Sequence, residues 1–267
     1  MERFHKGELE AQRRAGVEEL ARRVGRIIGT DIPSAVAAFL SSRAFLVVAT
    51  EGGAGVHASL LEGDPGFVTV SDDHTLAINP ARGDLETVRA DVAGNGVLGL
   101  LAIDFPTRRR MRVNGLATVD RDRIVLTTRE VYGNCPQYID PRNQLHDAVT
   151  LTTTMSHALD ERQQAWIASA DTFFIASVNA ERGADASHRG GEPGFVAVTP
   201  TSVSWPDYEG NNMFNTIGNL LLDPRCSLLF VEFQSGATLR VDGSAIVRWD
   251  GERRIAVEVE TVVERRV

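Results

Sequence analysis

Two short polar segments in the second half of the chain carry residue types suited to binding an anion. They consist of Ser187, His188 and Arg189, and of Asp207, Tyr208, Gly210, Asn211 and Asn212. An arginine makes bidentate, charge-assisted hydrogen bonds to phosphate or carboxylate groups. Glycine and small amides at the start of a helix, predicted here over 211–223, leave backbone N–H groups free, and the helix dipole favours negative charge there. We therefore predict phosphate binding, with a polar turn and a helix cap as the alternative interpretations.

These segments lie in the second of two similar halves of the chain. When residues 58–70 are placed over 186–198, an offset of 128, 8 of 13 residues are identical. Three further pairs of blocks share this offset: LLAIDF (100–105) with LLFVEF (228–233), RVNGLATV (112–119) with RVDGSAIV (240–247) and, more weakly, FLVVA (45–49) with FFIAS (173–177). A repeat this long predicts two fused copies of one domain, because the units of a solenoid have only about 20–50 residues.

Each copy is expected to begin with a helix and to continue with short strands. Periodicity predicts helices over 32–43 and 159–170, the second with a capping box at Asp160 and Gln163. Seven β-rich runs follow in the first copy: AFLVVAT, GVHASLL, GFVTV, HTLAIN, VLGLLAIDF, RVNGLATV and IVLTT. This pattern, with one embedded helix, indicates a mostly β protein built from small antiparallel barrels.

The predicted domains are a first barrel over 31–150 and a second over 151–267, preceded by a helical segment over 1–30. That segment is rich in arginine and glutamate. We expect it either to pack across the barrels or a partner chain, or to be a solvated helix with a structural role.

The composition excludes several classes of protein. The chain has 267 residues and a formal net charge of −8, which argues against general binding to nucleic acid or membrane surfaces. Its longest apolar run, Val97 to Ile103, is much shorter than the ~20 residues of a membrane helix. The charged first residues do not resemble a signal peptide, and Cys135 and Cys226 are too few for a disulfide framework. The expected location is cytoplasmic.

The second copy runs through the segments SHRGGEPGFV, DYEGNN, DPRCSLLFVEF and TLRVDGSA, and the first copy contains FHKGELEAQRRAGV upstream and YGNCPQYI (132–139) at its end. This order resembles the pyridoxamine 5′-phosphate oxidase-like family of flavin-binding split barrels, in a tandem branch with two barrels. The resemblance implies a six-stranded Greek-key split barrel in each copy. It also implies that the copies form a pseudo-dimer and that FMN lies in a groove between them.

The two copies differ at the positions that the resemblance assigns to FMN. In the first copy Leu60 and Leu61 stand where the second has His188 and Arg189, and Asp84 stands where the second has Asn212. Leucines remove hydrogen-bond donors and an aspartate repels phosphate, so we expect one competent groove, built on the second copy. If residues 132–139 reach over that groove, they add further lining residues: Asn134, Gln137 and Tyr138.

The function implied is that of an FMN-binding oxidoreductase, in which the flavin carries a hydride or electrons to a small substrate. NAD(P)H or a reduced partner protein would be the electron donor, and a homodimer is expected by analogy. No residue stands out as a catalytic proton donor. Pyridoxamine phosphate is not the expected substrate, because amides replace the basic residues that the resemblance implies at 210–212. Deazaflavin and haem are alternative ligands, and a non-enzymatic flavin- or haem-binding protein or a purely structural fusion are the alternative functions.

An arginine run and the remaining histidines and cysteines give weaker signals. Arg108, Arg109, Arg110 and Arg112 are expected mainly as solvated or ion-paired residues of a strand, with a role near the flavin or an anionic substrate as the alternative. Arg112 aligns with Arg240 in the repeat, which favours a shared structural role. The histidines lack the spacing of metal ligands, Cys226 is expected in the core, and Cys135 is not expected to be catalytic.

Overall fold

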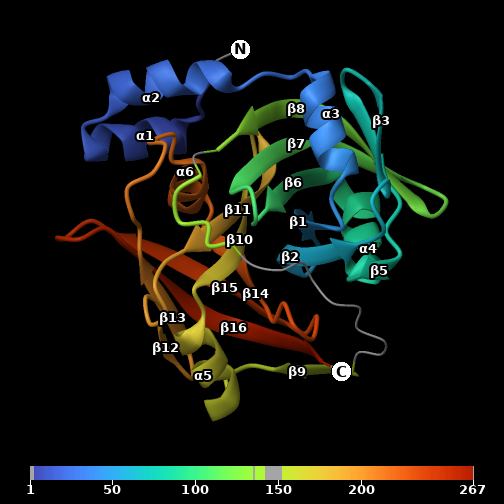
Figure 1. Cartoon of the computed structure of the whole chain (residues 1–267). Coiled ribbons are helices and arrows are strands. Elements are labelled where there is room, and N and C mark those ends of the chain that lie inside the picture. Colours follow the sequence, from blue (N-terminus) through green and yellow to red (C-terminus); the bar gives the residue numbers. More distant parts are fainter. Residues whose placement is uncertain (1–2, 135, 142–151, 267) are drawn as a thin grey trace.

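The computed structural model describes residues 3–134, 136–141 and 152–266 and contains two curled, antiparallel β-sheets (Figure 1). The first sheet has the strand order β3-β4-β8-β7-β6-β1-β2-β5. Its strands are β1 (Phe45–Gly52), β2 (Gly55–Glu62), β3 (Val68–Asp72), β4 (Thr75–Ile78), β5 (Arg82–Gly83), β6 (Val97–Asp104), β7 (Arg109–Asp120) and β8 (Arg123–Gly133). All seven β-rich runs of the first copy form strands.

The second sheet repeats the topology of the first. Its order is β11-β10-β14-β15-β16-β13-β12, and β9 pairs with β16 outside this path. Its strands are β9 (Thr152–Ser156), β10 (Thr172–Asn179), β11 (Gly183–Gly190), β12 (Ala197–Thr199), β13 (Ser202–Pro206), β14 (Arg225–Val231), β15 (Thr238–Arg248) and β16 (Arg254–Arg266). Seven strands of each sheet therefore correspond in the same order, as expected for a tandem repeat. Each sheet has eight strands where the resemblance implies six. The seven corresponding strands are one more than the resemblance implies, β5 adds an eighth at the edge of the first sheet, and β9 adds an eighth to the second by pairing with β16.

One part of the repeat alignment is wrong by one residue. Val47 of β1 pairs with Leu101 of β6, and Phe174 of β10 pairs with Leu229 of β14. The strands β6 and β14 thus correspond at an offset of 128, but β1 and β10 correspond at 127. The cause is a β10–β11 turn that is one residue longer than the β1–β2 turn. Because a shift of one residue exchanges the two faces of a strand, FLVVA and FFIAS do not match position by position.

The helices lie outside the two sheets and pack against their strands. They are α1 (Lys6–Ala15), α2 (Glu18–Val24), a short 3₁₀ turn (Gly25–Ile27), α3 (Ser34–Ser41), α4 (Leu85–Asn95), α5 (Glu161–Ser169) and α6 (Asn215–Leu222). The capping box of Asp160 and Gln163 at the start of α5 is confirmed. The N-terminal segment is helical, divided at Gly16, which ends α1 in the left-handed conformation. In Figure 1, α1 and α2 (dark blue) lie over α6.

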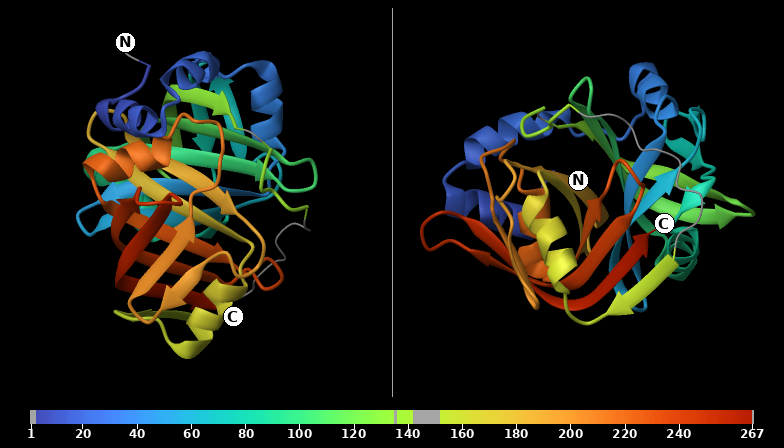
Figure 2. Two further views of the ribbon diagram at one scale, coloured as in Figure 1. Left: turned by 90° about the vertical axis from the view of Figure 1, so that its left-hand side faces the viewer. Right: turned by 60° about the horizontal axis from the view of Figure 1, so that its bottom comes forward.

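Three apolar clusters stabilise this arrangement. Each sheet encloses a core of its own, centred on residues such as Leu76 in the first copy and Trp205 in the second. A third cluster joins the copies, with Phe45, Leu101 and Phe174 fully or almost fully buried between β1, β2, β6 and β10, β11, β14. The sheets approach so closely that a Cβ atom on Gly99 would lie 2.5 Å from the carbonyl oxygen of Ala184. Figure 2 shows the two sheets packed against each other, and polar residues line the edges of this contact.

Candidate functional site

Ten of the eleven predicted site residues line two adjoining cavities at one edge of the contact between the copies. The first cavity, of about 90 Å³, is lined by residues that include Asn134, Tyr138, Ser187, His188, Arg189, Tyr208, Gly210 and Asn211. The second, of about 70 Å³, adds Asp207 and Asn212. We call the two together the polar groove. Gln137 is exposed and lines neither cavity.

The first copy contributes Arg112 of β7 to the base of this groove. Its Nη1 atom donates to both carboxylate oxygens of Asp185 on β11, each at 3.1 Å, and its Nη2 atom donates to the Ser187 hydroxyl. Nη1 also donates to the hydroxyl of Tyr132 at 3.3 Å. Burial by itself would lower the pKa of the Arg112 guanidinium, but the Asp185 carboxylate and the Tyr132 hydroxyl together outweigh burial and raise it. Arg112 is therefore a permanent, buried positive charge.

Arg110, two residues earlier on the same strand, fixes the protonation of His188. Its Nη1 atom lies 2.9 Å from Nδ1 of His188. Because a guanidinium can only donate, Nδ1 must accept and the ring proton resides on Nε2. The His188 ring is buried and contacts Phe105 and Phe174. The side chain is thus held as a neutral imidazole of defined tautomer.

Arg189 and Arg253 share a carboxylate at the other end of the groove. Nη1 of Arg189 lies 3.3 Å from Oδ1 of Asp207, and Nε of Arg253 donates to Oδ2 at 2.6 Å. Burial lowers the pKa of Arg189, and the neighbouring arginines contribute to the same direction. Asp207 therefore holds two guanidinium groups side by side. Arg253 comes from the β15–β16 turn and supplies a basic group that the segment 210–212 lacks.

The helix at this end begins later than the sequence predicts. α6 starts at Asn215 rather than at 211, and its N-cap is Phe214 in the left-handed conformation, with φ of 64°. Asn211 and Asn212 therefore belong to the preceding turn, and the interpretation of Asn211 and Asn212 as helix caps is wrong. The Asn211 side chain instead accepts a hydrogen bond from the backbone N–H of Met213 at 3.1 Å.

The segment around Tyr138 crosses from the first copy to this groove. Asn211 donates from Nδ2 to Oδ1 of Asn134 at 2.7 Å. The rings of Tyr138 and Tyr208 stack with 5.3 Å between their centroids. The chain lies directly on β11, since a Cβ on Gly190 would be 2.0 Å from the carbonyl oxygen of Tyr138. Cys135 lies outside the described residues.

Several buried donors of the groove have no hydrogen-bond partner among residues 3–134, 136–141 and 152–266. They are Nε of Arg112, Nδ2 of Asn134, Nε of Arg189 and Nε1 of Trp205, together with the Thr216 hydroxyl in the second cavity. Unsatisfied buried polar groups are costly, so a ligand rich in acceptors would stabilise them. A phosphorylated, carbonyl-bearing ring such as a flavin fits this donor set. The cavities are smaller than the ~300–1,000 Å³ of pockets that enclose a small molecule, so such a ring would project outward or displace the stacked tyrosines.

The equivalent position in the other half of the repeat is closed by ion pairs. A cavity of about 20 Å³ is lined by Ser59 and Asp84 of the first copy and by Arg240 and Arg265 of the second. Oδ2 of Asp84 lies 3.0 Å from Nη1 of Arg240, and Oδ1 lies 3.6 Å from Nη1 of Arg265. Asp84 is the N-cap residue of α4, yet its side chain makes no capping hydrogen bond. Its carboxylate thus pairs with Arg240, the repeat counterpart of Arg112.

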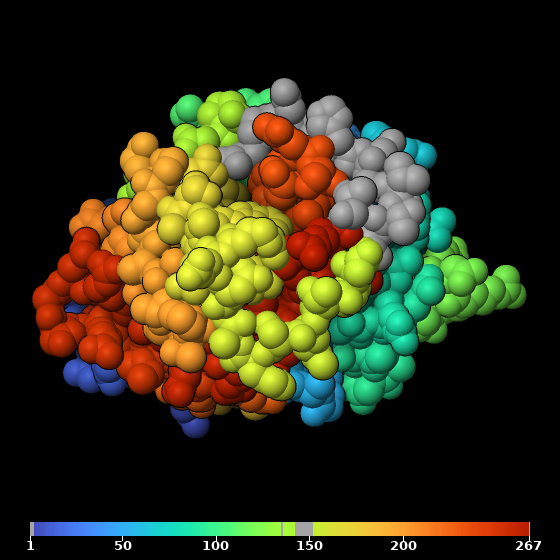
Figure 3. Space-filling model, turned by 90° about the horizontal axis from the view of Figure 1, so that it is seen from below, coloured from blue at the N-terminus to red at the C-terminus, as the bar shows by residue number. Residues whose placement is uncertain are grey.

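A further cavity, of about 810 Å³, contains none of the predicted site residues. It lies where α5 (yellow), the β14–β15 turn (orange) and β16 (red) adjoin in Figure 3. An ion pair between Arg162 and Glu264 is part of its lining. Within the described part of the chain, no cluster of three or more histidine, cysteine or acidic residues could hold a metal ion. No helix there is long and apolar enough to cross a membrane. Cys226 is buried in the core, as predicted.

Sequence reasoning missed part of the groove. Arg112 is ion-paired with Asp185, as the main expectation for the arginine run has it, but Arg110 and Arg112 also line the groove, which was only the alternative expectation. Their spacing of two on a strand was the available signal, because it places them on one face. Arg253 comes from a turn without a repeat partner, and Asn215 and Thr216 were assigned to the body of a helix. No motif or spacing in the sequence marks Arg253, Asn215 or Thr216 as residues of a binding site.

Comparison with known proteins gives one family match. Residues 159–265, which contain α5, β10–β15 and nearly all of β16, match the model of the family described as pyridoxamine 5′-phosphate oxidase. No match was found among curated proteins.

Solved structures of low sequence identity resemble parts of the chain. Group A Streptococcus HupZ, as an alanine variant, is 11% identical over 39% of this chain and 98% of its own, with a TM-score of 0.33. A putative pyridoxamine 5′-phosphate oxidase from Lactobacillus delbrueckii is 16% identical over 40% of this chain and 94% of its own, with a TM-score of 0.33. The FAD-binding protein from Mycobacterium smegmatis is 12% identical over 42% of this chain and 98% of its own, with a TM-score of 0.30.

Proposed function

We propose that the chain is an FMN-binding oxidoreductase of the pyridoxamine 5′-phosphate oxidase-like family with one flavin groove per chain, a proposal that the match of residues 159–265 to the family model supports. The observation that carries this proposal is the polar groove itself. Four arginines line it, Arg110, Arg112, Arg189 and Arg253, against two acidic residues, Asp207 and Glu209. This surplus of positive charge favours a ligand that carries a phosphate.

The phosphate would lie in the second cavity, near the start of α6. Arg112 and Arg189 line that cavity, and each has a buried Nε–H group without a partner among the described residues. The hydroxyl of Thr216 is in the same situation. Backbone N–H groups in the first turn of α6 add to the favourable potential for an anion.

The flavin ring would lie in the first cavity, toward Tyr138 and Tyr208. The Nδ2 group of Asn134 and the indole N–H of Trp205 are donors for the carbonyl and nitrogen acceptors of the ring. Phe195, beside Tyr208, offers an apolar surface. Residues of the first copy would thus contact a ligand held mainly by the second.

When bound, the flavin would supply hydride or electron transfer to a small substrate. The chain's own part is to bind the phosphate, to orient the ring and to exclude water from one of its faces. Arg110 holds His188 as a neutral imidazole with its proton on Nε2. The electron donor would be NAD(P)H or a reduced partner protein, and a homodimer of the chain is part of the proposal.

A single groove per chain follows from the ion pairs at the equivalent position. There the Asp84 carboxylate already neutralises Arg240 and Arg265, and the remaining cavity of about 20 Å³ has no room for a flavin. An anionic ligand would have to displace this internal carboxylate. The two halves of the repeat would therefore differ in ligand binding although they share one topology.

The visible spectrum of the purified protein, followed by titration with FMN and with riboflavin, tests this proposal. A flavin spectrum, or saturable quenching of FMN fluorescence with weaker binding of riboflavin, is the expected result. Riboflavin lacks the phosphate and serves as the matched control. A sharp Soret band would favour the haem-binding alternative, and no chromophore with no FMN binding would refute the proposal.

A further inference from the structure

The N-terminal helix α1 packs directly on the helix that bounds the phosphate end of the groove. A Cβ atom on Gly7 of α1 would lie 2.0 Å from the carbonyl oxygen of Gly218 on α6. A Cβ on Gly218 would lie 2.6 Å from the backbone nitrogen of Glu8. The two backbones are therefore in contact, and only glycine at both positions allows the first turn of α1 to come so close.

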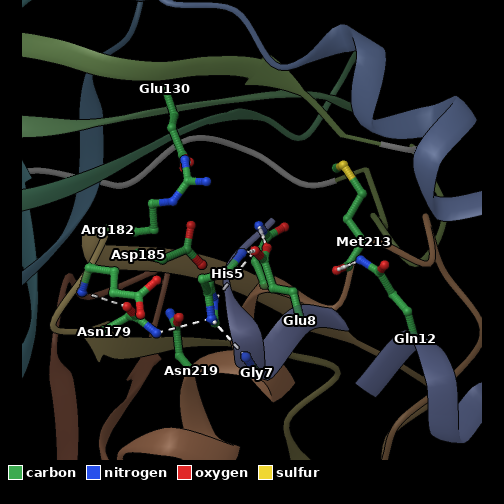
Figure 4. Close-up of polar contacts among 12 residues, drawn as sticks. His5, Gly7, Glu8, Gln12, Glu130, Asn179, Arg182, Asp185, Met213 and Asn219 are labelled. Atoms are coloured by element: carbon green, nitrogen blue, oxygen red, sulfur yellow. Dashed lines mark hydrogen bonds and ion pairs between the residues drawn. The ribbon is translucent and has the colours of Figure 1, made fainter. Parts of the chain in front are cut away.

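This contact brings the side chain of Glu8 into the interior, where it is 3% exposed. Its Oε1 atom accepts a hydrogen bond from Nδ2 of Asn215 at 2.6 Å, and Oε2 accepts one from the backbone N–H of His5 at 2.9 Å. Figure 4 shows Glu8 and His5 beside Asp185. Burying an acidic side chain is costly, and the cap of α1 alone does not account for the burial of Glu8.

Asn215 connects Glu8 to the groove. It is the first residue of α6, lines the second cavity and accepts a hydrogen bond from Nη1 of Arg112 through Oδ1 at 3.4 Å. Its amide therefore has Glu8 on one side and the guanidinium of Arg112 on the other. A change in the charge or position of the Glu8 side chain would therefore alter the position of the Asn215 amide and, through it, that of the Arg112 guanidinium.

The titratable and charged groups that act on Glu8 are His5, the N-cap residue of its own helix, Glu130 on β8, Asp185 on β11 and Arg182 before β11, which pairs with Glu130 at 3.1 Å. Arg112 on β7 is linked to Glu8 through the Asn215 side chain of α6. Burial raises the pKa of Glu8 to about 8, the Glu130 and Asp185 carboxylates add to the rise, and the His5 N–H group and Arg182 oppose it. Burial lowers the pKa of His5 to about 4, so its ring is neutral at pH 7.

A neutral Glu8 leaves two carboxylates, Glu130 and Asp185, opposite two guanidinium groups, Arg112 and Arg182. An ionised Glu8 adds a third negative charge beside them. That charge would lower the positive potential that Arg112 presents to the groove, and the buried position of the cluster limits screening by salt.

We propose that Glu8 is a positioning residue for the phosphate end of the groove: it orients Arg112 through Asn215, and its own charge state changes the positive potential that Arg112 presents to the groove. The proposal rests on the proposed function, because the ligand in question is FMN. It makes α1 a part of the ligand site rather than a solvated structural helix.

The test is the FMN affinity of the full chain at pH 7 and pH 9, measured by fluorescence quenching, for wild type, Glu8→Gln and Glu8→Ala. Glutamine cannot ionise and has one acceptor oxygen, so it can keep the hydrogen bond from Asn215 but loses the one from the His5 backbone N–H group. Alanine removes both. A thermal melt of each variant shows whether it is folded, and riboflavin shows how much of any effect depends on the phosphate.

We expect wild-type affinity for FMN to fall about three- to tenfold from pH 7 to pH 9. Glu8→Gln should bind FMN as wild type does at pH 7 and change less than twofold with pH. Glu8→Ala should bind about fivefold more weakly at pH 7. A pH profile of Glu8→Gln equal to that of wild type, or wild-type affinity in Glu8→Ala, would overturn this inference alone. Absence of FMN binding to the wild-type chain would overturn it together with the proposed function.

Discussion

The Nη1 atom of Arg112 lies 3.1 Å from both carboxylate oxygens of Asp185, although the two residues belong to different copies of the repeat. Both side chains are buried, so this contact cannot be a screened surface ion pair. It fixes the position of β7 relative to β11 at the base of the polar groove. The groove is therefore a product of both halves, and substitutions in either half should affect ligand binding.

The Arg189→Ala variant should lose FMN affinity by about 1.5–3 kcal/mol, because a charge-assisted contact to the phosphate is removed. Fluorescence quenching by FMN measures the loss. Arg123→Ala is the matched control, since Arg123 is exposed, lies outside the groove lining and pairs with the nearby Asp120. If Arg189→Ala binds FMN as tightly as wild type, the assignment of the groove is wrong.

The Gly190→Ala variant should weaken FMN binding although it removes no polar group. The added Cβ would meet the carbonyl oxygen of Tyr138 at 2.0 Å and push the segment of the first copy away from the groove. Gly94→Ala is the control, because Gly94 lines neither cavity of the groove and a Cβ there meets nothing within 4 Å. Equal FMN affinities of the two variants would show that this segment does not contribute to binding.

The Asp84→Ala variant should be destabilised by about 1–3 kcal/mol, because Arg240 and Arg265 lose the carboxylate between them. Unfolding by urea measures this change. Inorganic phosphate at constant ionic strength should restore more stability to the variant than it adds to wild type, since it can occupy the vacated position. An unchanged stability and the same response to phosphate would contradict a role for Asp84 in closing the second position.

The stability of the chain should depend on pH through Glu8. Its pKa in the folded protein is about 8, above the usual value, so the folded state binds more protons than the unfolded state between about pH 4.5 and 8. Stability from this group is therefore lost as the pH rises through that range. The lowered pKa of His5, about 4, acts in the opposite direction but only up to about pH 6.5.

The difference in unfolding free energy between wild type and Glu8→Gln isolates this contribution. From pH 6.5 to 8 the wild type should lose stability relative to the variant, and the difference should become constant above pH 8. Denaturant unfolding at four or five pH values is sufficient. A difference that stays constant from pH 6 to 9 would mean that Glu8 does not carry a raised pKa.

The sequence predicts the repeat, the order of strands and most of the groove because these depend on local pattern. Alternating apolar residues and turn residues specify strands such as β6 and β7, and Ser187 to Arg189 lie on a strand next to them. The slip of one residue in β10 was not predictable from the match of FLVVA with FFIAS, because it arises from the length of the following turn. Because both segments are almost entirely apolar, FLVVA and FFIAS look alike whether they are aligned at an offset of 127 or of 128.

Long-range contacts account for what the sequence did not predict. The roles of Arg112 and Arg253 depend on the packing of one copy against the other and on a turn whose conformation no motif specifies. The start of α6 depends on Phe214, which adopts a left-handed conformation that a phenylalanine rarely takes. Glu8 is one acidic residue among many in an N-terminal helix, and only the glycine contact with α6 distinguishes it.

The most direct test of the central claim is the stoichiometry of FMN binding to the wild-type chain, measured by equilibrium dialysis at saturating FMN. The polar groove carries a surplus of arginines, and its repeat counterpart is closed by Asp84. We therefore predict one FMN per chain. Two FMN per chain would contradict the asymmetry of the two halves, and no bound FMN would contradict the assignment of the groove to a flavin.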